Sequence, residues 1–170
     1  MRPVARKGLR TIGAMLAALA AAAPACAAPV ATVSANIVRP ITLTWLQDLD
    51  LGTITLGPGT WSGATVAISQ AGVLSCSNPN VTCSGPTKVA QYNVIGTNKQ
   101  VITINAPNVV MVNQGDPTKT LTLTVDKPAS VTLTNSGQPG VNFSLGGSIA
   151  VNSTTADGVY AGTFNVTVDY

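Results

Sequence analysis

The chain contains neither histidine nor glutamate, and this absence limits the chemistry that it can perform. Its 170 residues include nine lysines and arginines and six acidic residues, all of them aspartates. General acid–base catalysis and the activation of a serine or cysteine nucleophile usually rely on histidine or glutamate. Lysine can act as the base in a Ser–Lys pair, but no Ser-x-x-Lys spacing occurs. The sequence therefore predicts a protein without catalysis and without a cofactor.

The chain also lacks an apolar run long enough to span a bilayer stably, and its start is instead typical of a secretory signal. Four cations (Arg2, Arg6, Lys7 and Arg10) precede a short alanine-rich apolar run from Ile12 to Ala23. Pro24 then ends the run, and Ala25-Cys26-Ala27 places small residues where a signal peptidase reads. We expect cleavage after Ala27, which makes residues 1–27 a signal peptide and residues 28–170 a secreted protein.

Two alternatives at the N-terminus stay open. The apolar run could be kept as a membrane anchor, although its length argues against this. Cys26 could be lipidated, although Ala23 stands where a lipoprotein signal usually has leucine. In either case the sequence does not choose between periplasm, cell surface and medium.

Removal of the signal changes the sign of the net charge. The whole chain carries a formal charge of +3, but residues 28–170 have five lysines and arginines against six aspartates, a net charge of −1. No basic patch remains to bind phosphates, so we expect no nucleic-acid partner. We also expect no membrane span after cleavage.

Only two cysteines follow the signal, Cys76 and Cys83. An even number of cysteines in an oxidising compartment predicts a disulfide bond. A zinc site would need further ligands, which a chain without histidine does not supply here.

Most segments after the signal alternate apolar and polar residues, which is the period expected of half-buried strands. The alternation recurs at Val33–Ile37, Ile41–Trp45, Val66–Ile68, Tyr92–Val94, Ile102–Ala106, Leu121–Val125, Val131–Leu133, Ile149–Val151 and Phe164–Tyr170. Glycine, proline and asparagine separate these segments, and Gly146-Gly147 marks a break before Ile149. The pattern predicts one all-β domain, an antiparallel β-sandwich of about eight to ten strands.

The order of four motifs resembles a bacterial secreted family, domain of unknown function 4402. These motifs are Ile41-Thr-Leu-Thr with Asp48-Leu-Asp-Leu-Gly-Thr-Ile54, Tyr92-Asn-Val-Ile-Gly96, Val101 to Pro107, and Gly158 to Tyr170. The last of them is similar to the C-terminal pattern of spore-coat-U-like and chaperone–usher pilin domains, which implies an immunoglobulin-like, pilin-like sandwich.

The resemblance implies a role for the C-terminal strand in assembly. Its residues are Gly158, Tyr160, Phe164, Val166, Val168 and Tyr170. In pilin-type assembly an extended segment adds to an open sheet edge, so other subunits or a periplasmic chaperone are the expected partners. An ordinary core strand of a self-complete sandwich explains the same alternation.

The N-terminal segment bears on this choice. Val33–Val38 is either the first strand or a free donor arm, with Arg39-Pro40 as a hinge and Ile41 opening the first true strand. Sequence alone leaves both interpretations open, with a slight preference for a self-complete domain.

Four further residues are candidates for binding. Asp48 and Asp50 could hold calcium, but two carboxylates supply few of the oxygen ligands that calcium needs. Solvent-facing strand positions explain the two residues better. Trp45 continues the apolar face of Ile41 and Leu43, which predicts core packing. Trp61, in a glycine-rich loop, is the candidate ligand contact.

Two functions therefore remain in competition. The first is a secreted structural or surface-assembly protein, pilin-like or coat-like. The alternative is an adhesive or glycan-binding module at the cell surface that uses the Trp61 loop.

Overall fold

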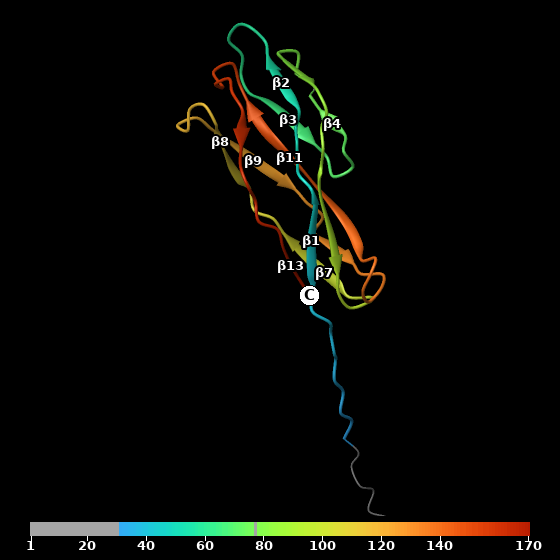
Figure 1. The fold of residues 1–170 in the computed structure, drawn as a ribbon. Helices are drawn as coiled ribbons and strands as arrows, with labels where there is room; N and C mark the ends of the chain where they lie inside the picture. Colours follow the sequence, from blue (N-terminus) through green and yellow to red (C-terminus); the bar gives the residue numbers. More distant parts are fainter. Residues whose placement is uncertain (1–30, 77) are drawn as a thin grey trace, which may run out of the picture. The chain divides into compact units, whose positions relative to one another are not determined.

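The computed structural model describes residues 31–76 and 78–170. The chain divides into two units, residues 1–35 and residues 36–170, and all strands of the described residues belong to the second unit (Figure 1). The predicted signal peptide, residues 1–27, and Cys26 lie outside the described residues. No helix in the described part of the chain is long and apolar enough to cross a membrane.

The second unit is all-β and antiparallel, which confirms the predicted fold class. The described residues form thirteen strands rather than eight to ten, because several strands have only two or three residues. The main sheet contains β1 (Thr42–Gln47), β3 (Ala64–Ile68), β4 (Leu74–Ser75), β6 (Ala90–Ile95), β8 (Val109–Asn113), β9 (Thr120–Asp126), β11 (Val141–Val151) and β12 (Tyr160–Ala161). A three-stranded sheet contains β7 (Val101–Asn105), β10 (Ser130–Thr132) and β13 (Thr167–Asp169), and a two-stranded sheet contains β2 (Thr53–Leu56) and β5 (Val81–Ser84).

The main sheet follows the order β1-β6-β11-β9-β8-β12, and β3 joins β11 to β4. Two apolar clusters lie between this sheet and the small sheets. The first joins β3, β9 and β11 to β5, with Val66 and Ile68 almost fully buried. The second joins β6 and β11 to β7, with Val94, Leu145 and Ile102 at or below 1% exposure. The alternating side chains thus meet across two layers, as a sandwich requires.

Strand β11 links the two clusters, and here the predicted break at Gly146-Gly147 is wrong. Residues Val141–Leu145 pair with β6, whereas residues from Gly146 onward pair with β9 and β3. A side chain at Gly146 would collide with the carbonyl oxygen of Ile68. Glycine at this position lets two backbones approach closely while the strand continues from one cluster to the other.

The predicted strand at Val33–Ile37 is also not formed. Residues 31–41 have no regular secondary structure, β1 begins at Thr42, and every residue from 31 to 40 is exposed. Val33 and Ile37 are 96% and 88% exposed, respectively. The segment alternates like a strand but has no partner strand among the described residues.

Trp45 does not pack in the core, contrary to the prediction. It lies in one cross-strand row with Tyr92 and Phe143, whose rings stack with centroids 5.6 Å apart. Exposure rises from 6% at Phe143 to 57% at Trp45. The cause is position, because β1 is the edge strand of the main sheet and, in the described part of the chain, pairs with β6 alone.

Candidate functional site

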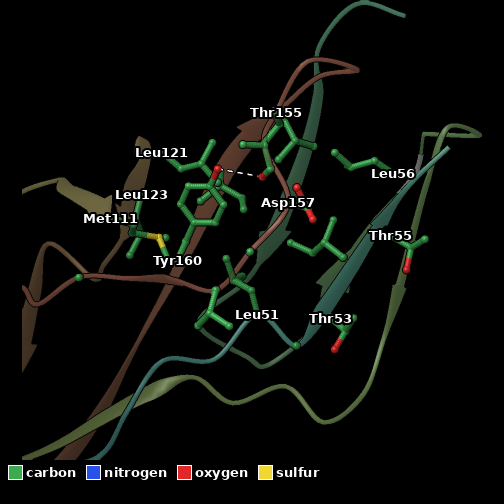
Figure 2. Close-up of a pocket in the computed structure, with 18 of the residues that line it drawn as sticks. Leu51, Thr53, Thr55, Leu56, Met111, Leu121, Leu123, Thr155, Asp157 and Tyr160 are labelled. Carbon is green, nitrogen blue, oxygen red and sulfur yellow. Dashed lines mark hydrogen bonds between the residues drawn. The ribbon is translucent and has the colours of Figure 1, made fainter. Parts of the chain in front are cut away.

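A groove of about 880 Å³ lies beside strand β2 in the second unit. We call it the β2 groove. It is bounded on one side by Leu49–Gly57 and on the other by residues 153–164, over a floor formed by β8, β9 and β11 (Figure 2). Three segments far apart in the sequence therefore enclose one elongated site.

Strand β2 presents an open backbone edge to this groove. Among the residues that the structure describes, β2 pairs only with β5, with Ile54 opposite Cys83 and Leu56 opposite Val81. The amide of Gly57 donates to the carbonyl of Asn80 at 2.7 Å. Because antiparallel strands exchange hydrogen bonds at alternate residues, the N–H and C=O groups of Ile54 and Leu56 face away from β5. No other strand of residues 31–76 and 78–170 pairs with them, so they can bind another extended backbone.

The floor of the groove is apolar. It is made of the side chains of Met111 on β8, Leu121 and Leu123 on β9, and Ile149 and Val151 on β11. Figure 2 shows Met111, Leu121 and Leu123 grouped on one side of the cavity, across from Leu51 and Leu56. These residues belong to or pack against the first apolar cluster, and Leu123, Ile149 and Val151 are each 4% exposed, so the floor is the flank of the hydrophobic core.

The far wall is held in place by Asn113, whose side chain is 2% exposed. Its Nδ2 donates to the carbonyl of Asp157 at 2.8 Å, and its Oδ1 accepts from the amides of Gly115 and Asp116. Gly158 has φ of +135°, and a side chain there would collide with the Asn113 amide. Asn113 thus fixes the wall to the β8–β9 hairpin.

The wall continues with Tyr160, which pairs with Asn113 on β8 and donates its hydroxyl to the carbonyl of Ala156 at 2.9 Å. Strand β12 pairs only with β8 within the described part of the chain. The groove therefore lies between two strands that each have one unpaired edge.

The groove carries little charge. The charged residues of its lining are Asp50 and Asp157. Asp50 accepts a hydrogen bond from the amide of Gly52 at 2.8 Å and exchanges two backbone hydrogen bonds with Lys88. Apart from these two aspartates, the groove offers an apolar floor and open backbone edges, which suit an extended peptide.

The predicted C-terminal assembly strand is not one strand in the structure. Gly158, Tyr160 and Phe164 line the β2 groove. Val166 and Val168 pack on the second apolar cluster, and β13 pairs with β7 of the same chain. The segment thus changes sheets near Gly162, where a side chain would meet Val109 Cγ1 at 2.9 Å.

The other candidate residues lie elsewhere. Cys76 and Cys83 form the predicted disulfide bond, with Cα atoms 6.1 Å apart. Asp48 and Asp50 are both exposed, as the strand pattern predicts, and Asp48 accepts from the indole N–H of Trp45 at 3.1 Å. The described residues contain no group of three histidines, cysteines or acidic residues able to hold a metal ion.

Trp61 is half-buried against the first apolar cluster, and its indole N–H donates to the carbonyl of Gly57 at 3.2 Å. This leaves less of the ring available to a sugar than an exposed platform would offer. Its role as a ligand contact stays a prediction.

Sequence reasoning missed both Asn113 and the open edge of β2. Asn113 ends an apolar run and stands before Gln114-Gly115-Asp116, so its position signals a turn but not a buried amide. Pairing between β2 and β5 depends on contacts across the chain, which no local pattern reveals.

The chain was compared with known proteins. No curated protein and no solved structure matches it. The family described as "Domain of unknown function (DUF4402)" matches residues 41–170, which include every strand of the second unit. The chain belongs to the DUF4402 family.

Proposed function

We propose that this protein is a secreted structural subunit of a surface assembly, without catalysis of its own, which binds other polypeptides by strand addition. The observation that carries the proposal is the β2 groove, where the open edge of β2 lies beside an apolar floor. Strand addition uses both features, since main-chain hydrogen bonds provide affinity and pockets for alternate side chains provide specificity.

Three further observations support this role. The predicted signal sequence favours export. The charged groups in the lining of the groove are Asp50 and Asp157. Acid–base catalysis most often uses histidine, which the chain lacks. The resemblance of Gly158–Tyr170 to pilin and spore-coat patterns points the same way, although the strand that this segment forms, β13, pairs with β7 of its own chain.

The structure also changes which element would serve assembly. With β13 paired to β7 and its side chains packed on the second cluster, the C-terminal strand completes its own domain. The proposed acceptor is therefore the edge of β2, and Gly158, Tyr160 and Phe164 contribute as the wall of the groove.

Size-exclusion chromatography with light scattering and electron microscopy of residues 28–170 test this proposal. We expect species larger than a monomer whose share grows with protein concentration. A strictly monomeric protein at all concentrations, which also binds no polypeptide from its own secreted fraction, would contradict it. Binding to a glycan array that is lost in Trp61→Ala would favour the adhesive alternative instead.

A further inference from the structure

We propose that the β2 groove receives the N-terminal segment of a second copy of this chain, residues 31–38, which we call the arm. The inference rests on the proposed function and names the partner that the groove accepts. It is carried by three observations: the chemistry of the groove, the exposure of the arm, and the place where the arm leaves the domain.

The arm has the chemistry that the groove requires. Ala31, Val33, Ala35 and Ile37 alternate with Thr32, Ser34 and Asn36, so an extended arm would present one apolar and one polar face. The apolar side chains are left in water in the described chain, where Val33 is 96% and Ile37 is 88% exposed. Residues 31–38 contain no charged side chain, so inserting the arm into the groove would remove no charge from water.

The lengths also agree. The groove is lined continuously by nine residues, Leu49 to Gly57. The apolar face of the arm, from Ala31 to Ile37, is seven residues long. An antiparallel or parallel partner of this length would cover the open N–H and C=O groups of Ile54 and Leu56 and place alternate side chains over Leu121, Leu123 and Ile149.

The arm of the same chain does not reach. Arg39 is held beside the C-terminus, because its amide donates to Thr97 Oγ1 at 2.6 Å and its carbonyl accepts from the Tyr170 hydroxyl at 2.6 Å. In Figure 1 the C-terminus and β2 lie at opposite ends of this domain. Ten residues lead from Arg39 through β1 to Leu49, where the groove begins, a distance of about 33 Å when extended.

Residues 28–38, from the predicted cleavage site to the end of the arm, span at most about 40 Å. An arm that returned along β1 to its own groove would have about two residues left to fill it. The groove is therefore open to the arm of another copy. Because arm and groove are different segments of the chain, such a contact is heterologous and need not close, which favours open chains of subunits.

The test uses residues 28–170 with Val33→Asp and Ile37→Asp together, since two carboxylates on the apolar face oppose insertion. The matched control is Ser34→Asp with Asn36→Asp, which adds the same charge to the polar face of the same arm. Both pairs lie outside the strands, so neither should affect folding, which circular dichroism checks.

A synthetic peptide of residues 28–39 is then added to the Val33→Asp/Ile37→Asp protein, and amide hydrogen exchange is followed. We expect exchange at Ile54 and Leu56 to slow by at least tenfold, and the peptide with the same two substitutions to bind at least tenfold more weakly. Unchanged exchange at both amides would overturn the inference.

Assembly of the unsubstituted protein separates this inference from the proposed function. Assembly that persists in Val33→Asp/Ile37→Asp means that another segment or protein occupies the groove, which overturns the inference and leaves the structural role intact. Peptide protection of Ile54 and Leu56 in a protein that never assembles supports the inference and overturns the structural role.

Discussion

The hydroxyl of Tyr170 donates a hydrogen bond to the carbonyl oxygen of Arg39 at 2.6 Å, although 131 residues separate the two. The hydroxyl oxygen of Tyr170 also accepts a hydrogen bond from the amide of Thr97 at 2.8 Å. The last residue of the sequence thus joins the start of β1 to the turn after β6. This contact fixes the point from which the arm leaves the domain, so it links stability to the proposed assembly.

We predict that Tyr170→Phe lowers the free energy of unfolding by about 0.5–1.5 kcal/mol, because it removes one hydroxyl that satisfies two backbone groups. Urea denaturation of residues 28–170 measures this. Exchange of the Thr97 amide should become faster in the same variant. Thr167→Ala, an exposed change on the neighbouring strand β13, is the control and should leave Thr97 exchange unaltered.

We predict that Gly96→Ala destabilises the protein by about 1–3 kcal/mol, as overpacking in a filled site does. A Cβ atom at Gly96 would lie 2.7 Å from the Tyr170 hydroxyl and 2.8 Å from Leu133 Cδ1. In a Tyr170→Phe background the cost should be smaller, because one of the two clashes is gone.

Gly63→Ala serves as the control for this pair, since its new Cβ would meet only Val151 O, at 3.7 Å. Strict additivity of Gly96→Ala and Tyr170→Phe would show that the two residues do not share this contact.

Asn113→Ala should cost about 2–4 kcal/mol of unfolding free energy, because three hydrogen bonds of a buried amide are lost together. The change should also loosen the wall of the β2 groove at Asp157 and Gly158, which amide exchange in residues 157–160 reports. Gln114→Ala removes a hydrogen bond of the adjacent, exposed side chain and is the matched control. Equal effects of the two substitutions would contradict the structural role of Asn113.

Acid stability should depend on the turn between β8 and β9. The side-chain hydroxyl and the amide of Thr118 donate to the carboxylate of Asp116, and these bonds lower its pKa below the ordinary value of 3.8. A carboxyl whose pKa is lower in the folded state contributes stability that is present above the unfolded pKa and is lost as pH falls through the folded pKa.

Thr118→Ala removes the hydroxyl bond and should move the pKa of Asp116 up towards its ordinary value. Carbon-13 NMR titration of the Asp116 carboxyl measures the change directly. A lowered or constant Asp116 pKa in Thr118→Ala would refute the assigned cause.

Periodicity was enough to predict the architecture, and physical reasons explain where it failed. Ile104, Leu123 and Leu133 alternate with polar residues and are buried as predicted, because alternation directly reflects which face of a strand meets the core. Val33 and Ile37 alternate equally well yet lie in water. Alternation records what a segment can bury, not whether its partner belongs to the same chain.

The site was less accessible to prediction than the fold. The C-terminal signature contains Gly158, Tyr160 and Phe164, but the groove that they line also needs Leu51 and Leu121, which are distant in the sequence. Trp45 shows the same limit, since its exposure depends on β1 being an edge strand. Strand order is a property of the whole chain and leaves no trace in a local pattern.

The central claim, that the arm of one copy fills the β2 groove of another, is tested most directly by a cross-link between two distinguishable copies. A photoreactive amino acid replaces Val33 in ¹⁵N-labelled protein, which is mixed with unlabelled protein, irradiated and analysed by mass spectrometry. The account predicts cross-links from position 33 of the labelled copy to residues 49–57 or to Leu121 and Leu123 of the unlabelled copy. Cross-links confined to one copy, or to surfaces outside the groove, would contradict it.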